Sequence, residues 1–216
     1  MFQNFDLGVF LLAVLPVLLA LTVREVARGY TARYWGDPTA QQYGRLTLNP
    51  LAHIDPIGTI VVPTIAFLLT PFLFGWAKPM PIDSRNFRDP RRAWRWVAVS
   101  GPLANLAMAF GWGLMAAVAP HVPEAYQYPL GEMAKYGVLI NAVLVALNLI
   151  PILPWDGGLL IDTFLSAKQS MQFRKIEPYG TWIILLLLIT GMLGMIIGPL
   201  VRLILVLVSQ FVGLFV

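Results

Sequence analysis

Long apolar runs constrain this chain more than any other feature of its sequence. Hydrophobic residues make up 58% of the 216 residues and charged residues only 12%, whereas a soluble domain has roughly 45–50% apolar and about 25% charged residues. A helix of about 20 apolar residues crosses the ~30 Å hydrocarbon core of a bilayer. We therefore expect an all-α polytopic membrane protein, a single integral membrane domain over residues 1–216 with five or six membrane segments. The apolar segments are 7–23, 57–74, 97–119, 137–154, 181–197 and 200–216.

Cysteine content and charge narrow the function classes. The chain has no cysteine, which excludes disulfides and thiolate metal sites. Its net charge of +4 is expected to report membrane topology, because Lys and Arg accumulate in cytoplasmic loops. The predicted partners are lipid and other membrane segments, and no nucleic acid is expected. Residues 1–6 contain no Lys or Arg, so the first apolar segment is expected to stay as a membrane helix and not to be a cleaved signal.

The distribution of Lys and Arg predicts an orientation. An outside N-terminus places the basic loops 24–56 and 75–96 in the cytoplasm, together with the basic residues between 168 and 175. If segment 57–74 crossed the membrane completely, one of the two basic loops would lie outside. We therefore expect this segment, which contains two prolines, to be a re-entrant hairpin or broken helix buried against protein. An ordinary span with an imperfect charge bias is the alternative.

A short charged motif follows the first apolar segment. Arg24 and Arg28 are four residues apart, so they share one face of a helix, with Glu25 beside them. If both arginines were histidine, the motif would read H-E-x-x-H, the zinc-binding helix of metalloproteases. The sequence thus raises the hypothesis of a membrane protease that lacks its metal ligands.

Four further motifs occur in the same order as in one enzyme family. They are 44–59 (GRLTLNPLAHIDPIGT), 74–79 (FGWAKP), 100–105 (SGPLAN) and 148–158 (NLIPILPWDGG). With the charged motif, they make the chain resemble the site-2 proteases, the intramembrane zinc metalloproteases, in their short bacterial form. The resemblance covers residues 7–165 and leaves 181–216 as additional C-terminal spans. It implies a multi-pass protein of the bacterial cytoplasmic (inner) membrane, with a site-2 protease-like helical core that includes the re-entrant segment.

The resemblance implies a role for each matched charged residue. In such a protease two histidines and an aspartate hold zinc, and these positions are Arg24, Arg28 and Asp156 here. Glu25 matches the general base that acts on the metal-bound water. Zinc needs lone-pair donors, but a guanidinium stays protonated, donates through five N–H groups and has no lone pair for a metal. We therefore expect no metal cofactor, although zinc is the family cofactor, and we expect Glu25 to be inactive.

A histidine elsewhere in the chain could contribute to a different metal site. A substitute site of Glu25, His53 and Asp156 is conceivable. The simpler expectation is that His53 forms a hydrogen bond with a buried carbonyl group or with Asp55.

The substituted charges suggest a structural role. Without zinc, Glu25 and Asp156 would be unpaired buried carboxylates, which is costly in a low-dielectric setting, and two arginines restore the two positive charges. We expect Arg24 and Arg28 to form ion pairs with Glu25 and Asp156 that join the first span to segment 137–154. The alternative is that both guanidinium groups reach the cytoplasmic interface and contact lipid phosphates.

Asn148, Pro151 and Pro154 match the motif that binds substrate in the family, and an interhelical hydrogen bond is the alternative role of Asn148. The glycines carry conformational expectations. Gly157 and Gly158 are expected to form a turn with positive φ, Gly101 to permit close helix packing, and 198–199 to break the last apolar region into two spans. The polar residues 120–136 are expected to form a loop.

The predicted function combines a retained scaffold with missing metal ligands. We expect a catalytically inactive pseudoprotease that binds transmembrane segments of client proteins. The alternative is an active intramembrane zinc metalloendopeptidase with a rearranged metal site. A pore or transporter has little support, because the charges expected within the membrane cluster at one level and do not form a path.

Overall fold

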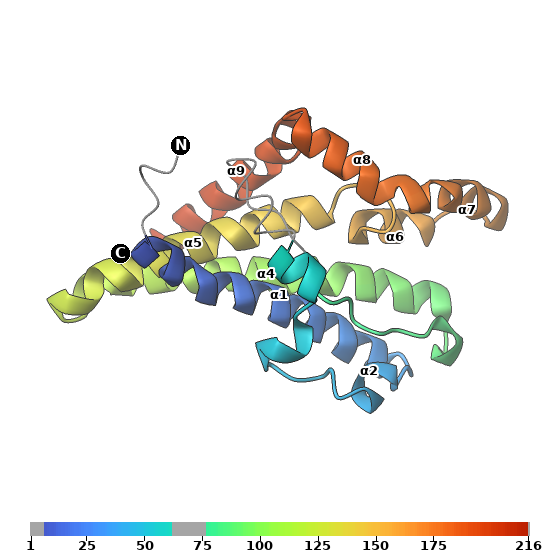
Figure 1. Ribbon diagram of the computed structural model, residues 1–216, viewed down its shortest axis with the longest axis horizontal. Coiled ribbons are helices and arrows are strands. Elements are labelled where there is room, and N and C mark those ends of the chain that lie inside the picture. The colour runs from blue at the N-terminus through green and yellow to red at the C-terminus, as the bar shows by residue number, and fades with distance from the viewer. Residues whose placement is uncertain (1–6, 62–76, 216) are drawn as a thin grey trace.

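The computed structural model describes residues 7–61 and 77–215, which are mainly helical and contain no strand. Four long helices form an elongated bundle (Figure 1): α1 Leu7–Tyr34, α4 Pro90–Val118, α5 Glu124–Asn148 and α9 Met192–Val212. The shorter elements are α2 Thr39–Gln42, η1 Pro50–His53, η2 Pro56–Val61, η3 Ser84–Asn86, η4 Ala119–His121, α6 Asp156–Asp162, α7 Ala167–Phe173, η5 Arg174–Ile176 and α8 Glu177–Ile189.

Three of the described helices are long and apolar enough to cross a membrane. They are α4 extended by η4 with 32 residues, α5 with 25 and α9 with 21. At 1.5 Å per residue even α9 is about 32 Å long, close to the ~30 Å hydrocarbon core. The predicted helical membrane protein is thereby confirmed, but this finding does not reach the predicted five or six segments. Of the predicted re-entrant segment, 57–61 belong to η2, and 62–74 lie outside the described residues.

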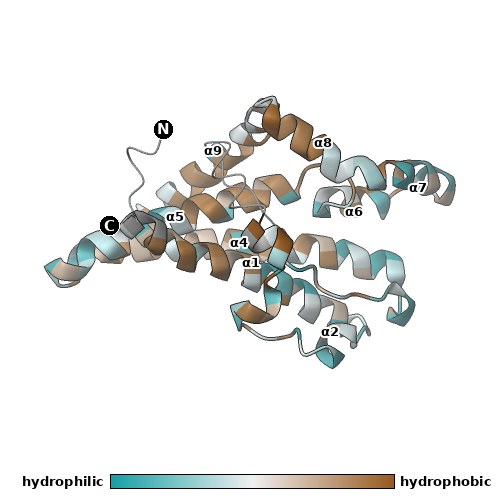
Figure 2. Ribbon diagram, viewed as in Figure 1, coloured by the Kyte–Doolittle hydropathy of each residue, from teal (hydrophilic) through white to brown (hydrophobic). Residues whose placement is uncertain are grey.

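Hydropathy separates the ends of the molecule from its middle. Figure 2 shows α8 and α9 mostly hydrophobic and α7 mostly hydrophilic. The elements α2 and α7 and the beginning of α4 lie at one end of the molecule, and the turn between α4 and α5 lies at the other (Figure 1). The basic residues at the start of α4 therefore share one end of the bundle with α2 and α7.

Two helices begin earlier than the apolar pattern predicts. The side chain of Asp89 accepts a hydrogen bond from the backbone N–H of Arg92 at 3.1 Å, and Pro90 is the first helical residue, so α4 starts seven residues before position 97. The predicted loop 120–136 is wrong, because α5 begins at Glu124. The polar residues before position 137 interrupt the apolar run, but they are still helical. Glu124 in the first turn of α5 stabilises this helix start, because a negative charge interacts favourably with the helix dipole there.

The predicted position of the break between the last two helices, 198–199, is wrong. Gly191, with φ of +74°, separates α8 from α9, whereas Gly198 and Pro199 lie inside α9. Helices commonly end at a left-handed residue, and glycine adopts that conformation without a steric penalty.

Small residues and buried amides hold the central helices together. Ala109 of α4 and Ala142 of α5 are fully buried and pack with Val208 of α9. The Nδ2 atom of Asn105 donates to the carbonyl of Ala20 at 3.0 Å and to Oδ1 of Asn141 at 2.8 Å. These bonds connect α1, α4 and α5 at one level and fix their relative position.

Candidate functional site

The charged motif of α1 lies where α1 meets α4 and the first residue of α6. Arg24 and Arg28 are one turn apart on α1 and point to the same side because of the helical period. Glu25 and Asp156 are only 2% and 1% exposed. Four charged side chains therefore gather inside the protein.

Both carboxylate oxygens of Glu25 have partners. Its Oε1 accepts from Nη1 of Arg24. Its Oε2 accepts from the backbone N–H of Met80 at 2.8 Å and lies 3.5 Å from Nη1 of Arg28. Met80 is itself buried, so the chain around it covers Glu25.

Asp156 contacts both arginines. The Nη2 atom of Arg24 donates to Oδ2 of Asp156 at 2.6 Å, and Nε of Arg28 lies 3.5 Å from Oδ1. The arginine side chains are 14% and 12% exposed, so the guanidinium groups point into the bundle. This arrangement differs from the alternative in which they reach lipid phosphates.

Asn148 is the last residue of α5 and belongs to the same cluster. Its Oδ1 accepts from Nη2 of Arg24 at 2.6 Å, and its Nδ2 donates to the carbonyl of Leu144 at 2.7 Å. Both polar atoms of this side chain therefore have partners within the protein. Pro151 and Pro154 lie in the connection between α5 and α6, and both are exposed.

Glycines make room for the cluster. A Cβ atom on Gly101 would lie 3.1 Å from Cγ of Arg24 and 3.3 Å from Oδ2 of Asp156, in accord with the expected close packing. The expected positive φ of Gly157 and Gly158 is wrong, because positive φ in the described residues occurs at other glycines. Both open α6, where a Cβ would lie 2.3–2.4 Å from backbone atoms of the α5–α6 connection, so the constraint is contact and not conformation.

His53 is 2% exposed and makes its own hydrogen bonds. Its Nε2 donates to the carbonyl of Thr47 at 2.8 Å, and its Nδ1 lies 3.5 Å from Nη2 of Arg45. The expected bond to a carbonyl is confirmed, and half-buried Thr47 supplies that carbonyl. Because a carbonyl only accepts, this bond assigns the proton to Nε2.

Three buried charged residues were not singled out by sequence reasoning: Arg45, Asp37 and Asp162. Arg45 is 7% exposed, and its Nη2 donates to the carbonyl of Lys78 at 2.9 Å. Asp37 is fully buried at the end of α1. The arginine belongs to the 44–59 motif, but nothing in its spacing indicates that it is buried, whereas an aspartate between Gly36 and Pro38, after a helix, is a recognisable turn signal.

Asp37 fastens the chain before α4 to the end of α1. Its Oδ2 accepts from the backbone N–H of Asp83 at 2.8 Å, and its Oδ1 accepts from Nδ2 of Asn86 at 2.9 Å and from the Thr39 hydroxyl. Burial by itself raises the pKa of the Asp37 carboxyl, but the hydrogen bonds from Thr39, Asn86 and the backbone outweigh burial and hold the pKa below its ordinary value. The residues that follow Met80 are therefore anchored a second time on α1.

The cluster does not fit a zinc ion. Zinc binds through nitrogen, oxygen or sulfur lone pairs, but Arg24 and Arg28 present only N–H donors. The oxygens of Glu25 and Asp156 already face these donors or the Met80 amide. Within residues 7–61 and 77–215, no three His, Asp or Glu side chains gather where they could hold a metal.

Known proteins resemble this chain over most of its length. It is 32% identical over 205 residues to "Putative zinc metalloprotease YwhC" of Bacillus subtilis, which covers 93% of this chain and 90% of that protein. It is 29% identical over 188 residues to "Putative zinc metalloprotease Rip2" of Mycolicibacterium smegmatis, covering 87% and 70%. The protein of that name from Mycobacterium tuberculosis is 23% identical over 187 residues.

No family model matches the sequence, and no solved structure gives a significant match. The likeness to the Bacillus protein nevertheless extends over nearly both chains. It agrees with the order of the sequence motifs and with the apolar helices. The chain therefore belongs to the site-2 protease-like family of membrane zinc metalloproteases.

Proposed function

We propose that this protein is a pseudoprotease: it binds transmembrane segments of client proteins in the membrane and does not cleave them through zinc. One observation carries the proposal. The guanidinium groups of Arg24 and Arg28 lie against Glu25 and Asp156, at the positions that resemble the catalytic and metal-binding residues of the family.

The first step of the argument is charge. Two arginines carry the same formal charge as one Zn²⁺ ion, and they meet the two carboxylates that would otherwise be buried without partners. A buried carboxylate without a counter-charge is strongly disfavoured. The ion pairs thus replace the electrostatic role of a metal without its Lewis acidity.

The second step concerns proton transfer. A general base needs a carboxylate oxygen within hydrogen-bond reach of the proton that it accepts. In Glu25 one oxygen receives Arg24 and the other receives the Met80 amide at 2.8 Å. Glu25 is therefore suited to an ion pair and not to general-base catalysis.

The third step concerns what the fold retains. Arg24 joins α1 to Asn148 at the end of α5 and to Asp156 at the start of α6. The residues that resemble the substrate-binding motif stay beside this junction, with Pro151 and Pro154 exposed. A family scaffold that keeps this arrangement without metal donors is suited to hold a peptide instead of hydrolysing it.

The alternative is an active intramembrane zinc metalloendopeptidase with a rearranged site. The names of the relatives as zinc metalloproteases favour it. It would require His53 to exchange its hydrogen bond with Thr47 for a metal and to join Glu25 and Asp156, after both carboxylates had separated from the arginines.

Metal content tests the proposal directly. The protein is purified in detergent, equilibrated with Zn²⁺ and desalted, and the zinc-to-protein ratio is measured by elemental analysis. We expect well below one zinc per chain for the unaltered protein. The double substitution Arg24→His and Arg28→His is expected to raise the ratio to about one, because it supplies two imidazole donors beside Asp156. Arg33→His, at an exposed position of the same helix, is the matched control and should not raise it.

A cleavage and binding assay separates the two functions. A transmembrane peptide with a photo-crosslinker is incubated with the protein in lipid nanodiscs. We expect crosslinked but uncleaved peptide. Cleavage that disappears with Glu25→Gln, or one tightly held zinc in the unaltered protein, would replace the pseudoprotease with the enzyme.

The same proposal includes a topology. The protein lies in the bacterial cytoplasmic membrane with five or six membrane segments, its N-terminus outside and the basic loops 24–56 and 75–96 in the cytoplasm. Lys and Arg counts support this orientation, and the polar end formed by α2, α7 and the start of α4 is its structural counterpart.

A further inference from the structure

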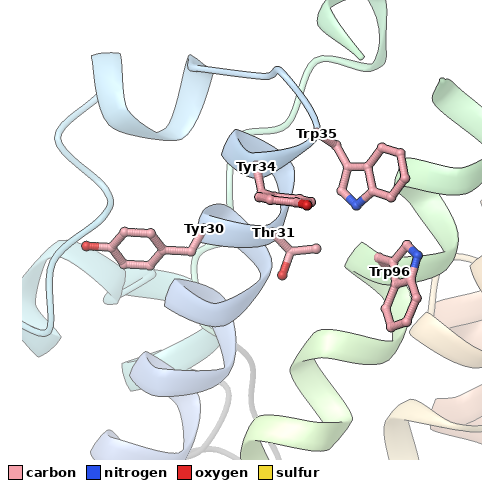
Figure 3. Close-up of a pocket in the computed structure, with 5 residues that line it drawn as sticks. All are labelled: Tyr30, Thr31, Tyr34, Trp35 and Trp96. Atoms are coloured by element: carbon pink, nitrogen blue, oxygen red, sulfur yellow. The ribbon is translucent and has the colours of Figure 1, made fainter. Parts of the chain in front are cut away.

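An aromatic pocket of about 490 Å³ lies between the end of α1 and the first turns of α4. It is lined by Tyr30, Thr31, Tyr34 and Trp35 from one side and by Trp96 from the other. Figure 3 shows the rings of Tyr34, Trp35 and Trp96 around one space, with Tyr30 directed away from it. The Tyr34 and Trp35 rings meet edge to face, with centroids 6.1 Å apart.

The pocket lies at the boundary between basic and apolar residues. Helix α4 with η4 has 32 residues, about 48 Å, so it exceeds the ~30 Å hydrocarbon core and its first turns extend past it. Trp96 directly follows the basic residues of these turns and precedes the apolar part of the helix. Trp and Tyr are enriched at this depth, where lipid headgroups lie.

The polar atoms of the three rings are available to a ligand. Among the described residues, the Tyr34 hydroxyl and the indole N–H groups of Trp35 and Trp96 have no hydrogen-bond partner. Figure 3 shows the Tyr34 hydroxyl and the Trp35 indole nitrogen on the side of the shared space. Indole N–H groups only donate, so a suitable ligand carries acceptor oxygens.

Positive charge lies at the rim. Arg92 is one helical turn before Trp96 on the same face of α4. Its pair with Asp89 is 3.3 Å long and the two side chains are 71% and 44% exposed, so the pair is weak and open to exchange. Arg33, next to Tyr34, is also exposed, and no carboxylate lines the pocket.

We propose that this pocket binds one anionic phospholipid. The headgroup phosphate accepts hydrogen bonds from the indole N–H groups and pairs with Arg92, and the glycerol region lies against the rings. An acyl chain follows the lipid-facing side of α4 toward Leu103, which is 52% exposed and two turns from Trp96 on the same face. A membrane lipid fits because the pocket combines headgroup depth, positive charge and a continuous apolar path.

Native mass spectrometry of the whole protein in detergent tests this site. Phosphatidylglycerol and phosphatidylcholine with identical acyl chains are added in turn. We expect one retained phosphatidylglycerol per chain and weaker retention of phosphatidylcholine. Trp96→Leu should abolish the retained lipid. Arg92→Gln should weaken phosphatidylglycerol about fivefold, the equivalent of roughly 1 kcal/mol for one basic side chain near the surface.

The control is Trp182→Leu, which removes a Trp that is 71% exposed on α8, outside the pocket. It should leave lipid retention unchanged. Trp96→Phe keeps the ring and removes only the N–H, so it reports the hydrogen bond if the leucine variant fails to fold. Equal retention of both lipids, or equal loss with Trp182→Leu, would reduce the pocket to ordinary interfacial aromatics. Trp96-dependent binding of a transmembrane peptide in the absence of lipid would reassign it to a protein partner.

Discussion

The guanidinium of Arg24 connects three chain segments. It contacts Glu25 in its own helix, Asn148 at the end of α5 and Asp156 at the start of α6. Because Arg28 approaches the same two carboxylates at 3.5 Å, removing one carboxylate leaves two cations facing a single negative charge. Loss of one charged residue should therefore destabilise the protein more than loss of one charge of each sign.

Asp156→Ala is expected to destabilise the protein by about 3–5 kcal/mol, because it leaves a buried guanidinium without its partner. Thermal unfolding in detergent, followed by circular dichroism, measures the effect. The double substitution Arg24→Met and Asp156→Leu should recover most of the loss, since it removes one charge of each sign. Asp83→Ala, which removes a local pair with the exposed Arg85 outside the cluster, is the control. An unchanged unfolding temperature for Asp156→Ala would show that the ion pairs do not hold α1 to α6.

At this scale the sequence predicts a contact where the spacing of residues along a helix determines it. It does not predict a contact that depends on how distant parts of the chain fold together. Four-residue spacing places Arg24 and Arg28 on one side of a helix, and motif order places Asp156 near them. No pattern indicates that the Met80 amide would bond to Glu25, because 55 residues separate them. The Gly157 and Gly158 expectation was wrong for the same reason: the contacts that exclude a Cβ come from the preceding chain.

At the scale of elements, the chain from Met80 to Arg88 is held along α1. Its amides bond to Glu25, to Asp37 and to the carbonyl of Trp35. Of these anchors Asp37 lies after the end of α1, and the hydrogen bonds to its carboxyl hold the pKa below its ordinary value. Its contribution to stability is therefore fully present above the unfolded pKa of about 3.9 and is lost as the pH falls through the lower folded value.

Acid is accordingly expected to release the Asp83 region from α1. Hydrogen exchange of the Asp83 and Asn86 amides, corrected for the intrinsic pH dependence, should show lower protection at about pH 3 than at about pH 6. Asp37→Asn keeps an acceptor oxygen but cannot titrate, so its protection should be lower at both pH values and independent of pH. A pH response that persists in the asparagine variant would assign the change to another group.

The α8–α9 connection provides a matched pair of glycines. Gly191→Ala is expected to destabilise the protein by about 1–2 kcal/mol, because φ is +74° there and an L-residue is strained in that region. Gly194→Ala should stabilise it by about 0.5–1 kcal/mol, because the residue is helical and a Cβ would meet nothing within 4 Å. Thermal unfolding measures both. Equal effects would place the helix break somewhere other than Gly191.

Helix positions were predictable from apolar runs, but helix ends were not. The thickness of the hydrocarbon core sets how many apolar residues a membrane span needs, but it does not determine where the helix ends in water. α5 therefore starts 13 residues before Gly137, through a stretch whose polarity suggests a loop. The capping by Asp89 and the left-handed Gly191 decide the other two boundaries.

For the whole molecule, the sequence predicted a helical membrane bundle, and three of the described helices are long and apolar enough to cross a membrane. The orientation rests on charge counts alone, and the fold makes it testable. α4 and α5 run in opposite directions, and the turn at His121 lies at the opposite end of the bundle from α2 and α7 (Figure 1), so two helices that both cross the membrane would place it on the opposite side. The absence of native cysteine allows single labelling sites to be introduced without background.

We expect His121→Cys to react with a membrane-impermeant maleimide on intact spheroplasts, because basic loops stay in the cytoplasm and place this turn outside. Gln42→Cys in α2 and Lys168→Cys in α7, both exposed, should react only after permeabilisation. The reverse pattern would invert the orientation while keeping the spans. Labelling of His121→Cys and Lys168→Cys from the same side would contradict α5 as a span, and with it the membrane level assigned to the arginine cluster, since Asn148 fixes that level from the end of α5.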